Sequence, residues 1–591
     1  MEGGSQEHGE EKLVAVARQI AQSLDRNDFM PDDIINIFST IDGRFSHDKF
    51  ETPSDRTLVA NLNRRISRYL SSDTPIWSDP ADSSAFLDAI DELLSTLPHM
   101  TSKLAADLVN SAMVQLGEEF RLLMERGPES LRRSTRRGRF GSPGDVSSDQ
   151  DDDDENIPVA NPLTDLDVLV DPFPPSTVAD LQEISKRMVP AGFHKDCSHA
   201  YSVSRRDFLE ESMSRLGLEK LTCEDIQKMA WDDVEYHIDI WIRATPVVLR
   251  ILFPSERRLC DRVFLEYPKV ASQSFVGTCR SAAFQILSFA DAVAIGGKAP
   301  ERLFCVLDLL EAMRDLLPYF EANFSDESCI YLRNEALSVW KRLADAVRGI
   351  FMELESLIRR DPAKTPPSCG SVHPITRYVL NYLRKAAGEY RETLEQVFEE
   401  GEAIMYSLSM RMQWIMELLE NNLETKSEMY GDRALRWVFM LNNATYILKK
   451  VEEGDLGLLL GDEWLMKHKS KVKHFLSAYI KTSWAKILNL LGAESGGGMK
   501  EKLKQFNSQF EETCVVQSQW SAYDEHLRKR LTMSIADLVL SPYESFLARF
   551  HNSPEVGMHA ERYIRYGLED VEIKIGKLFQ GGSESSGGLR N

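Results

Sequence analysis

The chain has 591 residues, more than one hydrophobic core usually serves, and this length allows roughly three to five packing units. Apolar residues make up 43% and charged residues 27%, which excludes global disorder and is typical of a protein with packed cores. The formal net charge of -22 disfavours contact with nucleic acid or anionic lipid except where basic residues cluster locally.

The small number of turn residues favours long helices, because all-β proteins need frequent Gly and Pro, and only 33 Gly and 24 Pro occur here. The eight Cys are scattered without a C-x-x-C motif, which indicates reduced thiols in the cytoplasm. The first residues are polar and acidic and lack the apolar core of a signal peptide. No apolar stretch approaches the roughly 18 residues of a membrane span, so we expect any membrane contact to be peripheral.

The N-terminal part, residues 1–129, reads as a helical region. Apolar residues recur every three or four positions, which places them on one face of each helix. This spacing predicts amphipathic helices over residues 11–24, 31–46, 84–97 and 104–124.

Residues 130–175 read as a disordered linker with segregated charge. Five Arg lie within 132–139, and an acidic run follows at 149–155. Apolar residues do not recur at regular spacing here, so little apolar burial is available to offset the entropy lost when a chain is ordered. Ser134 and Thr135 stand among the arginines and Ser142 precedes a proline. These three residues are candidate phosphorylation sites, and the alternative is a plain solvated linker.

Helical periodicity resumes near residue 176 and continues to about 580, and residues 581–591 read as a disordered tail. The string PVVLRILF (246–253) resembles a strand, but its helical flanks favour a helix. Short loops between helices predict an all-α fold, an elongated rod of consecutive antiparallel helical bundles, with 541–580 as its C-terminal end. The expected helices cover residues 205–217, 223–243, 275–294, 301–317, 332–358, 374–423, 430–452, 464–491, 499–514, 516–539 and 543–551.

Catalytic and cofactor motifs are missing. The chain has no phosphate-binding G-x-x-x-x-G-K-[ST] loop, no G-x-S-x-G elbow and no H-E-x-x-H pair, so we expect neither an enzyme nor a bound cofactor. The best metal candidate is the string His194-Lys-Asp-Cys197-Ser-His199, but a structural zinc site needs four ligands and no second cluster completes it. We therefore predict no metal site.

One segment reverses the local charge. Residues 467–486 carry six lysines and two histidines without any acidic residue. A basic helix of this kind binds anionic lipid headgroups with about 1 kcal/mol per lysine. The alternative, which we weigh equally, is a helix whose lysines pair with acidic neighbours in the fold. The lysines are Lys467, Lys469, Lys471, Lys473, Lys481 and Lys486.

Seven strings, in order and in spacing, resemble the seventy-kilodalton subunit of the exocyst in its plant form. They are YSVSRRDFLEESMSRLGLEKLTCEDIQ (201–227), SERRLCDRVF (255–264), HPITRYVLNYL (373–383), FMLNNATYIL (439–448), LGDEWLMKHKSKVKHF (460–475), SPYESFLARF (541–550) and ERYIRYGLEDVE (561–572). The N-terminal strings EEKLVAVARQIAQSL, IINIFSTIDGRFS and WSDPADSSAFLDAIDELL resemble the B clade of that family.

This resemblance implies a non-enzymatic tether that holds a secretory vesicle at the plasma membrane before fusion. It implies that residues 1–129 pair with another exocyst subunit and that the C-terminal bundle binds phosphatidylinositol 4,5-bisphosphate. In its motif E-[KR]-Y-I-[KR]-Y-G the basic positions fall on Arg562 and Arg565, three residues apart and so expected on one helix face. Lys574 and Lys577 complete the expected lipid-binding set.

The terminal segment departs from the family in its charge, since residues 543–577 contain five basic and six acidic residues. The 467–486 segment is therefore a second candidate for lipid contact.

A second class of function is a helical adaptor in plant defence signalling or autophagy-related transport that acts partly outside the complex. Its candidate partners are small GTPases, ubiquitin ligases and immune receptors, and its candidate locations include vesicles and autophagy-related compartments. The asparagines of FMLNNATYIL, Asn442 and Asn443, read as hydrogen-bonding residues inside a helix and not as a site. Three tryptophans, Trp340, Trp414 and Trp437, read as core residues.

Overall fold

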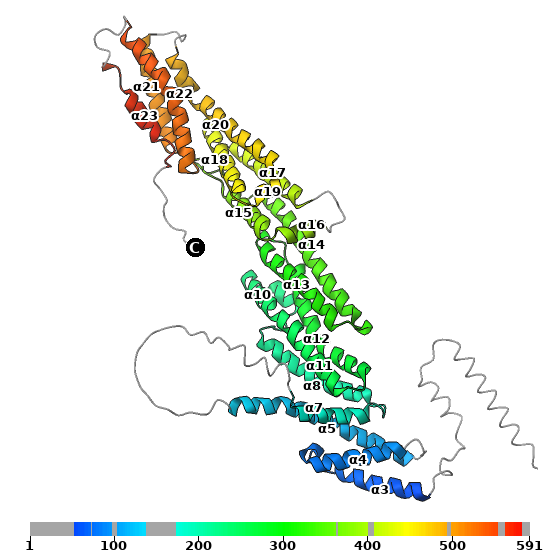
Figure 1. Ribbon diagram of the computed structural model, residues 1–591. Coiled ribbons are helices and arrows are strands. Elements are labelled where there is room, and N and C mark those ends of the chain that lie inside the picture. The colour runs from blue at the N-terminus through cyan, green and yellow to red at the C-terminus, as the bar shows by residue number, and fades with distance from the viewer. Residues whose placement is uncertain are drawn as a thin grey trace, which may run out of the picture. The chain divides into compact units, whose positions relative to one another are not determined.

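The structure is a computed structural model (Figure 1) that describes residues 53–72, 74–96, 103–137, 173–361, 365–399, 407–492, 498–553 and 562–581. The helices predicted over 11–24 and 31–46, Ser142 and the tail beyond 581 lie outside these residues. Within the described residues every regular element is a helix, apart from one isolated antiparallel bridge between Ser521 and Gln580. The all-α prediction is confirmed.

The described residues form two compact units. The first unit runs to Met213 and also contains Arg250–Ala282, and the second contains Ser214–Leu249 and the described residues from Ala283 onward.

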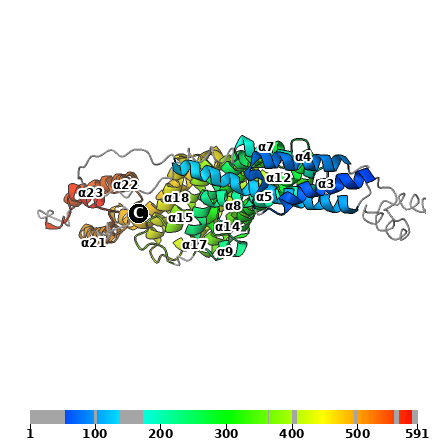
Figure 2. The same ribbon diagram turned by 90° about the horizontal axis from the view of Figure 1, so that it is seen from below.

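The first unit is built on helices α3 to α5, which lie side by side in Figure 2. Phe86, Ile90 and Phe120 are fully buried between these helices, as their three- and four-residue spacing predicts. The other helices join through α7, which packs on α5 and α11. The elements are α3 (Pro53–Leu70), η2 (Ile76–Ser78), α4 (Pro80–Thr96), α5 (Lys103–Arg137), α7 (Pro175–Met188), α8 (His194–Arg215), α11 (Phe253–Val263) and the first half of α12 (Pro268–Ile295).

A buried ion pair joins α8 to α11. Arg205 and Glu256 are 3% and 2% exposed, and the Arg205 Nη2 and Glu256 Oε2 atoms are 2.7 Å apart. The Tyr201 hydroxyl donates to the same carboxylate at 2.6 Å. Burying both charges is costly, and these hydrogen bonds offset part of that cost, although the buried Arg205 Nη1 has no partner among the described residues.

The second unit is a succession of packed helices. Along the chain α13 packs on α14, α14 on α17, α17 on α18, α18 on α20, and α20 on α21 and α22. Its elements are α9 (Cys223–Lys228), α10 (Trp231–Val247), η5 (Pro300–Arg302), α13 (Leu303–Asn323), η6 (Glu327–Cys329), α14 (Ile330–Arg360), α15 (Pro374–Glu389), α16 (Arg391–Glu399), α17 (Leu408–Ser427), α18 (Arg433–Glu452), α19 (Leu456–Leu460), α20 (Asp462–Leu491), α21 (Met499–Ser518), α22 (Glu525–His551) and α23 (Leu568–Gly576).

Several boundaries differ from the prediction. The expected helix over 374–423 is three helices, α15 to α17, and the stretches 516–539 and 543–551 are largely one helix, α22, which continues through Pro542. Helix α5 continues through Arg137, so the first residues of the predicted linker are helical. Arg is a good helix former, and a charge argument alone overlooks this propensity.

The segment over 246–253 is helical, as its flanks indicated. It consists of the end of α10, a π-helical turn (η4, Val248–Leu252) and the start of α11. Val248 and Leu249 are wholly buried there, so its apolar run reflects a buried helix.

The asparagines of the FMLNNATYIL string are structural, as predicted. Asn442 Nδ2 donates to the carbonyls of Gly370 and Ser521, both at 2.7 Å, and Asn442 Oδ1 accepts from the Tyr523 amide at 2.7 Å. Asn443 Oδ1 accepts from the backbone amide of His373 at 3.0 Å. These bonds attach the loops before α15 and before α22 to α18.

The tryptophan prediction is partly wrong. Trp340 is buried on α14, but Trp414 is 42% exposed on α17, where its indole donates to Glu355 at 3.1 Å. Trp437 is half-buried against Phe475. An indole at helical spacing is therefore not always a core residue, because its N–H can bind a surface carboxylate.

Candidate functional site

The predicted lipid-binding residues lie around the start and end of α23. Arg562 and Arg565 precede this helix, Lys574 is in its last turn and Lys577 follows it. The expectation that the two arginines share a helix face is wrong, because residues 563–567 form a turn and a non-helical stretch. Gly567, the N-cap of α23, ends the stretch.

Two tyrosine rings contact cations in this region. The Tyr566 ring centroid lies 5.3 Å from the Arg565 guanidinium and 5.0 Å from the Lys574 ammonium. The Tyr563 ring lies 4.8 Å from the ammonium of Lys500, at the start of α21. Each ring face attracts a nearby cation.

The tertiary structure thus adds Lys500 to the predicted set. No sequence signal points to this lysine, which is more than sixty positions from the motif. We name the group of Lys500, Arg562, Arg565 and Lys574 the α21–α23 basic cluster.

The cluster is partly neutralised within the fold. Arg565 forms an ion pair with Glu511 of α21, with 2.6 Å between Nη1 and Oε2. Arg562 is exposed and forms no ion pair with any described residue. Helix α23 begins with Glu569 and Asp570, which suit the positive end of the helix dipole but reduce the local positive potential.

The second basic candidate, residues 467–486, lies entirely on α20. Two of its six lysines form ion pairs within the fold, and the other four are left for contact with lipid. Lys469 pairs with Glu452 at 2.8 Å and Lys471 with Glu420 at 2.6 Å, as expected of a helix with acidic neighbours. The other four lysines are exposed and make no ion pair among the described residues; they are Lys467, Lys473, Lys481 and Lys486.

Glu420 also holds His468, which stacks on Trp464 with 3.5 Å between ring centroids. Burial opposes ionisation of Glu420, but hydrogen bonds from His468 and Lys471 outweigh it, so the pKa of this carboxyl is lowered. The side chains of His468 and Lys471 on α20 are therefore engaged in contacts within the fold.

The remaining sequence candidates do not converge on a site. Cys197 is buried on α8, where burial raises the pKa of its thiol, whereas His199 is exposed. Among the described residues no group of His, Cys, Asp and Glu could hold a metal ion. Ser134 and Thr135 fall in the last turn of α5.

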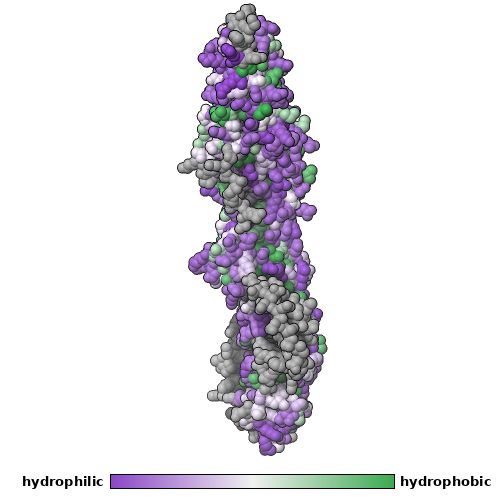
Figure 3. Space-filling view, turned by 90° about the vertical axis from the view of Figure 1, so that its left-hand side faces the viewer, coloured by the Kyte–Doolittle hydropathy of each residue, from purple (hydrophilic) through white to green (hydrophobic). Residues whose placement is uncertain are grey.

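The described helices include none that is both long and apolar enough to cross a membrane. The face shown in Figure 3 is largely hydrophilic, with scattered hydrophobic residues.

The family model for the C-terminal part of the Exo70 exocyst complex subunit matches residues 239–577, more than half of the chain. The chain belongs to the Exo70 family. Its similarity to the plant B clade is confirmed as well. It is 52% identical to exocyst complex component EXO70B1 of Arabidopsis thaliana and 43% identical to EXO70B2, in each case over 97% of this chain and 99% of the relative.

The Exo70 fold is also seen in solved structures. The crystal structure of the S. cerevisiae exocyst component Exo70p matches with a TM-score of 0.55 at 15% identity, over 89% of this chain and 100% of that one. The predicted Exo70-type fold of consecutive helical bundles is confirmed by this likeness.

Proposed function

We propose that the chain is an exocyst subunit that tethers secretory vesicles to the plasma membrane before fusion. Membership of the Exo70 family carries this proposal, together with near full-length relatives named as exocyst complex components. Its role is binding and not catalysis: it contacts other exocyst subunits and anionic phosphoinositide lipid, and it associates with the membrane from the cytoplasm.

The α21–α23 basic cluster is the proposed lipid contact. Exposed Arg562 offers a guanidinium that binds a phosphate through two hydrogen bonds. Arg565 would exchange its Glu511 partner for a headgroup phosphate, and Lys500 and Lys574 add charge beside it. Lys577 lies one turn beyond Lys574 and is exposed.

The direct test is the charge reversal Arg562→Glu with Arg565→Glu, measured by sedimentation with liposomes containing phosphatidylinositol 4,5-bisphosphate. Each basic residue near an anionic surface contributes about 1 kcal/mol, so the double change weakens binding by roughly tenfold or more. The loss is larger at low salt, where charges are less screened. An unchanged sedimentation profile would contradict the assignment.

A gain-of-binding variant makes the test sharper. Glu511→Gln frees Arg565 from its ion pair, so binding to the same liposomes should increase. Glu512→Gln is the matched control, since it removes the same charge one position away, where the structure gives Arg565 no partner. Equal effects of the two variants would show that only net charge matters.

The tethering role is tested by affinity purification of the full chain. Stoichiometric recovery of other exocyst subunits supports it, and recovery without them supports the adaptor alternative. The names of the relatives favour the complex subunit, and no described residue specifically favours the adaptor.

A further inference from the structure

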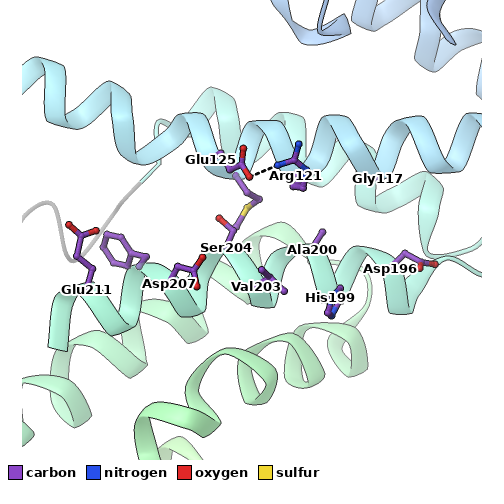
Figure 4. Close-up of a pocket in the computed structure, with 12 residues that line it drawn as sticks. Gly117, Arg121, Glu125, Asp196, His199, Ala200, Val203, Ser204, Asp207 and Glu211 are labelled. Atoms are coloured by element: carbon purple, nitrogen blue, oxygen red, sulfur yellow. Dashed lines mark hydrogen bonds and ion pairs between the residues drawn. The ribbon is translucent and has the colours of Figure 1, made fainter. Parts of the chain in front are cut away.

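A groove of about 510 Å³ runs between α5 and α8 in the first unit (Figure 4). Small side chains and one aromatic ring form much of its lining: Gly117 from α5, and Ala200, Val203, Ser204 and Phe208 from α8. Val203 is 41% exposed, so an apolar surface is open to contact. Small residues on two neighbouring helices allow the backbone of a third helix to approach closely.

Packing holds part of the groove lining in place. The Arg205 guanidinium lies 4.2 Å from the Phe208 ring centroid and is itself fixed by its buried pair with Glu256. On the other side, Met124 of α5 is fully buried. A preformed binding surface of this kind loses little conformational entropy when a partner binds.

Carboxylates dominate the charge of the groove. Among the described residues, four carboxylates line it, those of Glu125, Asp196, Asp207 and Glu211, together with the guanidinium of Arg121 and the imidazole of His199. Arg121 pairs with both Glu118 and Glu125, so neither Arg121 nor Glu125 is available to a ligand. Asp196 and Asp207 form no ion pair with any described residue and remain available. The rim therefore favours a cationic partner.

We propose that the α5–α8 groove is a docking site for a basic amphipathic helix of a partner protein. The apolar stripe of that helix would cover Ala200, Val203 and Ser204, and its Lys or Arg flanks would face Asp196 and Asp207. Asp196 and Asp207 are eleven positions apart on α8, so the groove accommodates about three turns of a helix. This mode, an amphipathic helix laid in a groove, is common in peptide recognition. The proposal does not depend on lipid binding, because it concerns other residues in the other unit.

The experiment measures binding of a fluorescein-labelled model helix to the full chain by fluorescence anisotropy. The peptide is about 18 residues of Leu, Ala and Lys with one apolar face, long enough to span the groove. A second peptide with Glu in place of Lys is the charge control. We expect the Lys peptide to bind at least tenfold more tightly than the Glu peptide.

Variants then locate the binding. Ala200→Trp fills the groove and should weaken binding of the Lys peptide at least tenfold, whereas Ala106→Trp, at an exposed position of α5 outside the groove, should change it less than twofold. Asp207→Lys should weaken it several-fold, against Asp88→Lys on α4 as the matched charge control.

Val203→Lys, at an exposed position, is an additional variant that keeps the proposal testable if Ala200→Trp fails to fold, which a thermal unfolding curve would show.

Three outcomes would overturn the proposal. Equal weakening by the controls would mean that the peptide is attracted only to the acidic chain as a whole. No effect of Asp207→Lys would mean that the rim is already neutralised within the chain. Sedimentation velocity that shows dimers sensitive to Ala200→Trp would assign the groove to a second copy of the chain instead.

Discussion

Asn442 offers the sharpest test of how the second unit holds its loops in place. Its side chain is wholly buried and makes three hydrogen bonds to backbone groups of two loops, those of Gly370, Ser521 and Tyr523. The same loop region contacts the segment after α23, since Gly581 donates its amide to the Trp520 carbonyl at 2.9 Å. Asn442→Ala should therefore loosen both loops and the residues that follow α23.

The magnitude follows from the bonds lost. Each hydrogen bond contributes about 1 kcal/mol net, and each buried group left without a partner costs about 1–3 kcal/mol. A carbonyl tolerates this loss better than an amide, so the Tyr523 N–H carries most of the penalty. We expect Asn442→Ala to lower the free energy of unfolding by ~3–5 kcal/mol.

Hydrogen exchange with mass spectrometry measures the effect locally. Peptides that cover 369–376 and 519–524 should exchange about 100-fold faster in the variant, as expected for a local loss near 3 kcal/mol. Asn421→Ala, at an exposed position of α17, is the control and should change stability by less than about 0.5 kcal/mol. If Asn442→Ala stays within 1 kcal/mol (a ~fivefold change in exchange), the structural role assigned to this asparagine is refuted.

Two further predictions concern buried charges. Glu420 has a lowered pKa in the fold, so its stabilisation is present above the ordinary carboxyl value of 4.5 and is lost as the pH falls through the folded value. Glu420→Gln should remove this part of the acid sensitivity, as seen in urea unfolding at neutral and acidic pH; an unchanged pH profile would contradict it. Arg205→Leu leaves Glu256 buried without its partner and should cost about 3–5 kcal/mol, whereas the added change Glu256→Leu should recover part of the loss. Thermal unfolding measures both, and a double variant less stable than the single one would refute this account.

The helix boundaries around Tyr390 and Pro542 could not be predicted from the sequence alone. The expected continuous helix over 374–423 breaks after Glu389, where Tyr390 ends α15 with a non-helical backbone, and its hydroxyl binds Asp308 of α13. In α22 the reverse occurs, because the chain passes through Pro542 as a helix. The missing N–H is tolerated there because the buried side chains of Val539 before the proline and Tyr543 after it hold the helix on both sides.

By itself, the sequence determined the all-helical class, most helix positions, the absence of known catalytic motifs and the Exo70 resemblance. Each of these depends on residues close together in the chain: apolar spacing, turn residues and short motifs. Only the tertiary structure decided which basic residues remain available. Arg565 forms an ion pair with Glu511 of α21, and Lys471 of α20 forms one with Glu420 of α17. Lys500 of α21 lies against the ring of Tyr563, which belongs to the distant motif. Charge pairing depends on separation in space, and the sequence gives only separation along the chain.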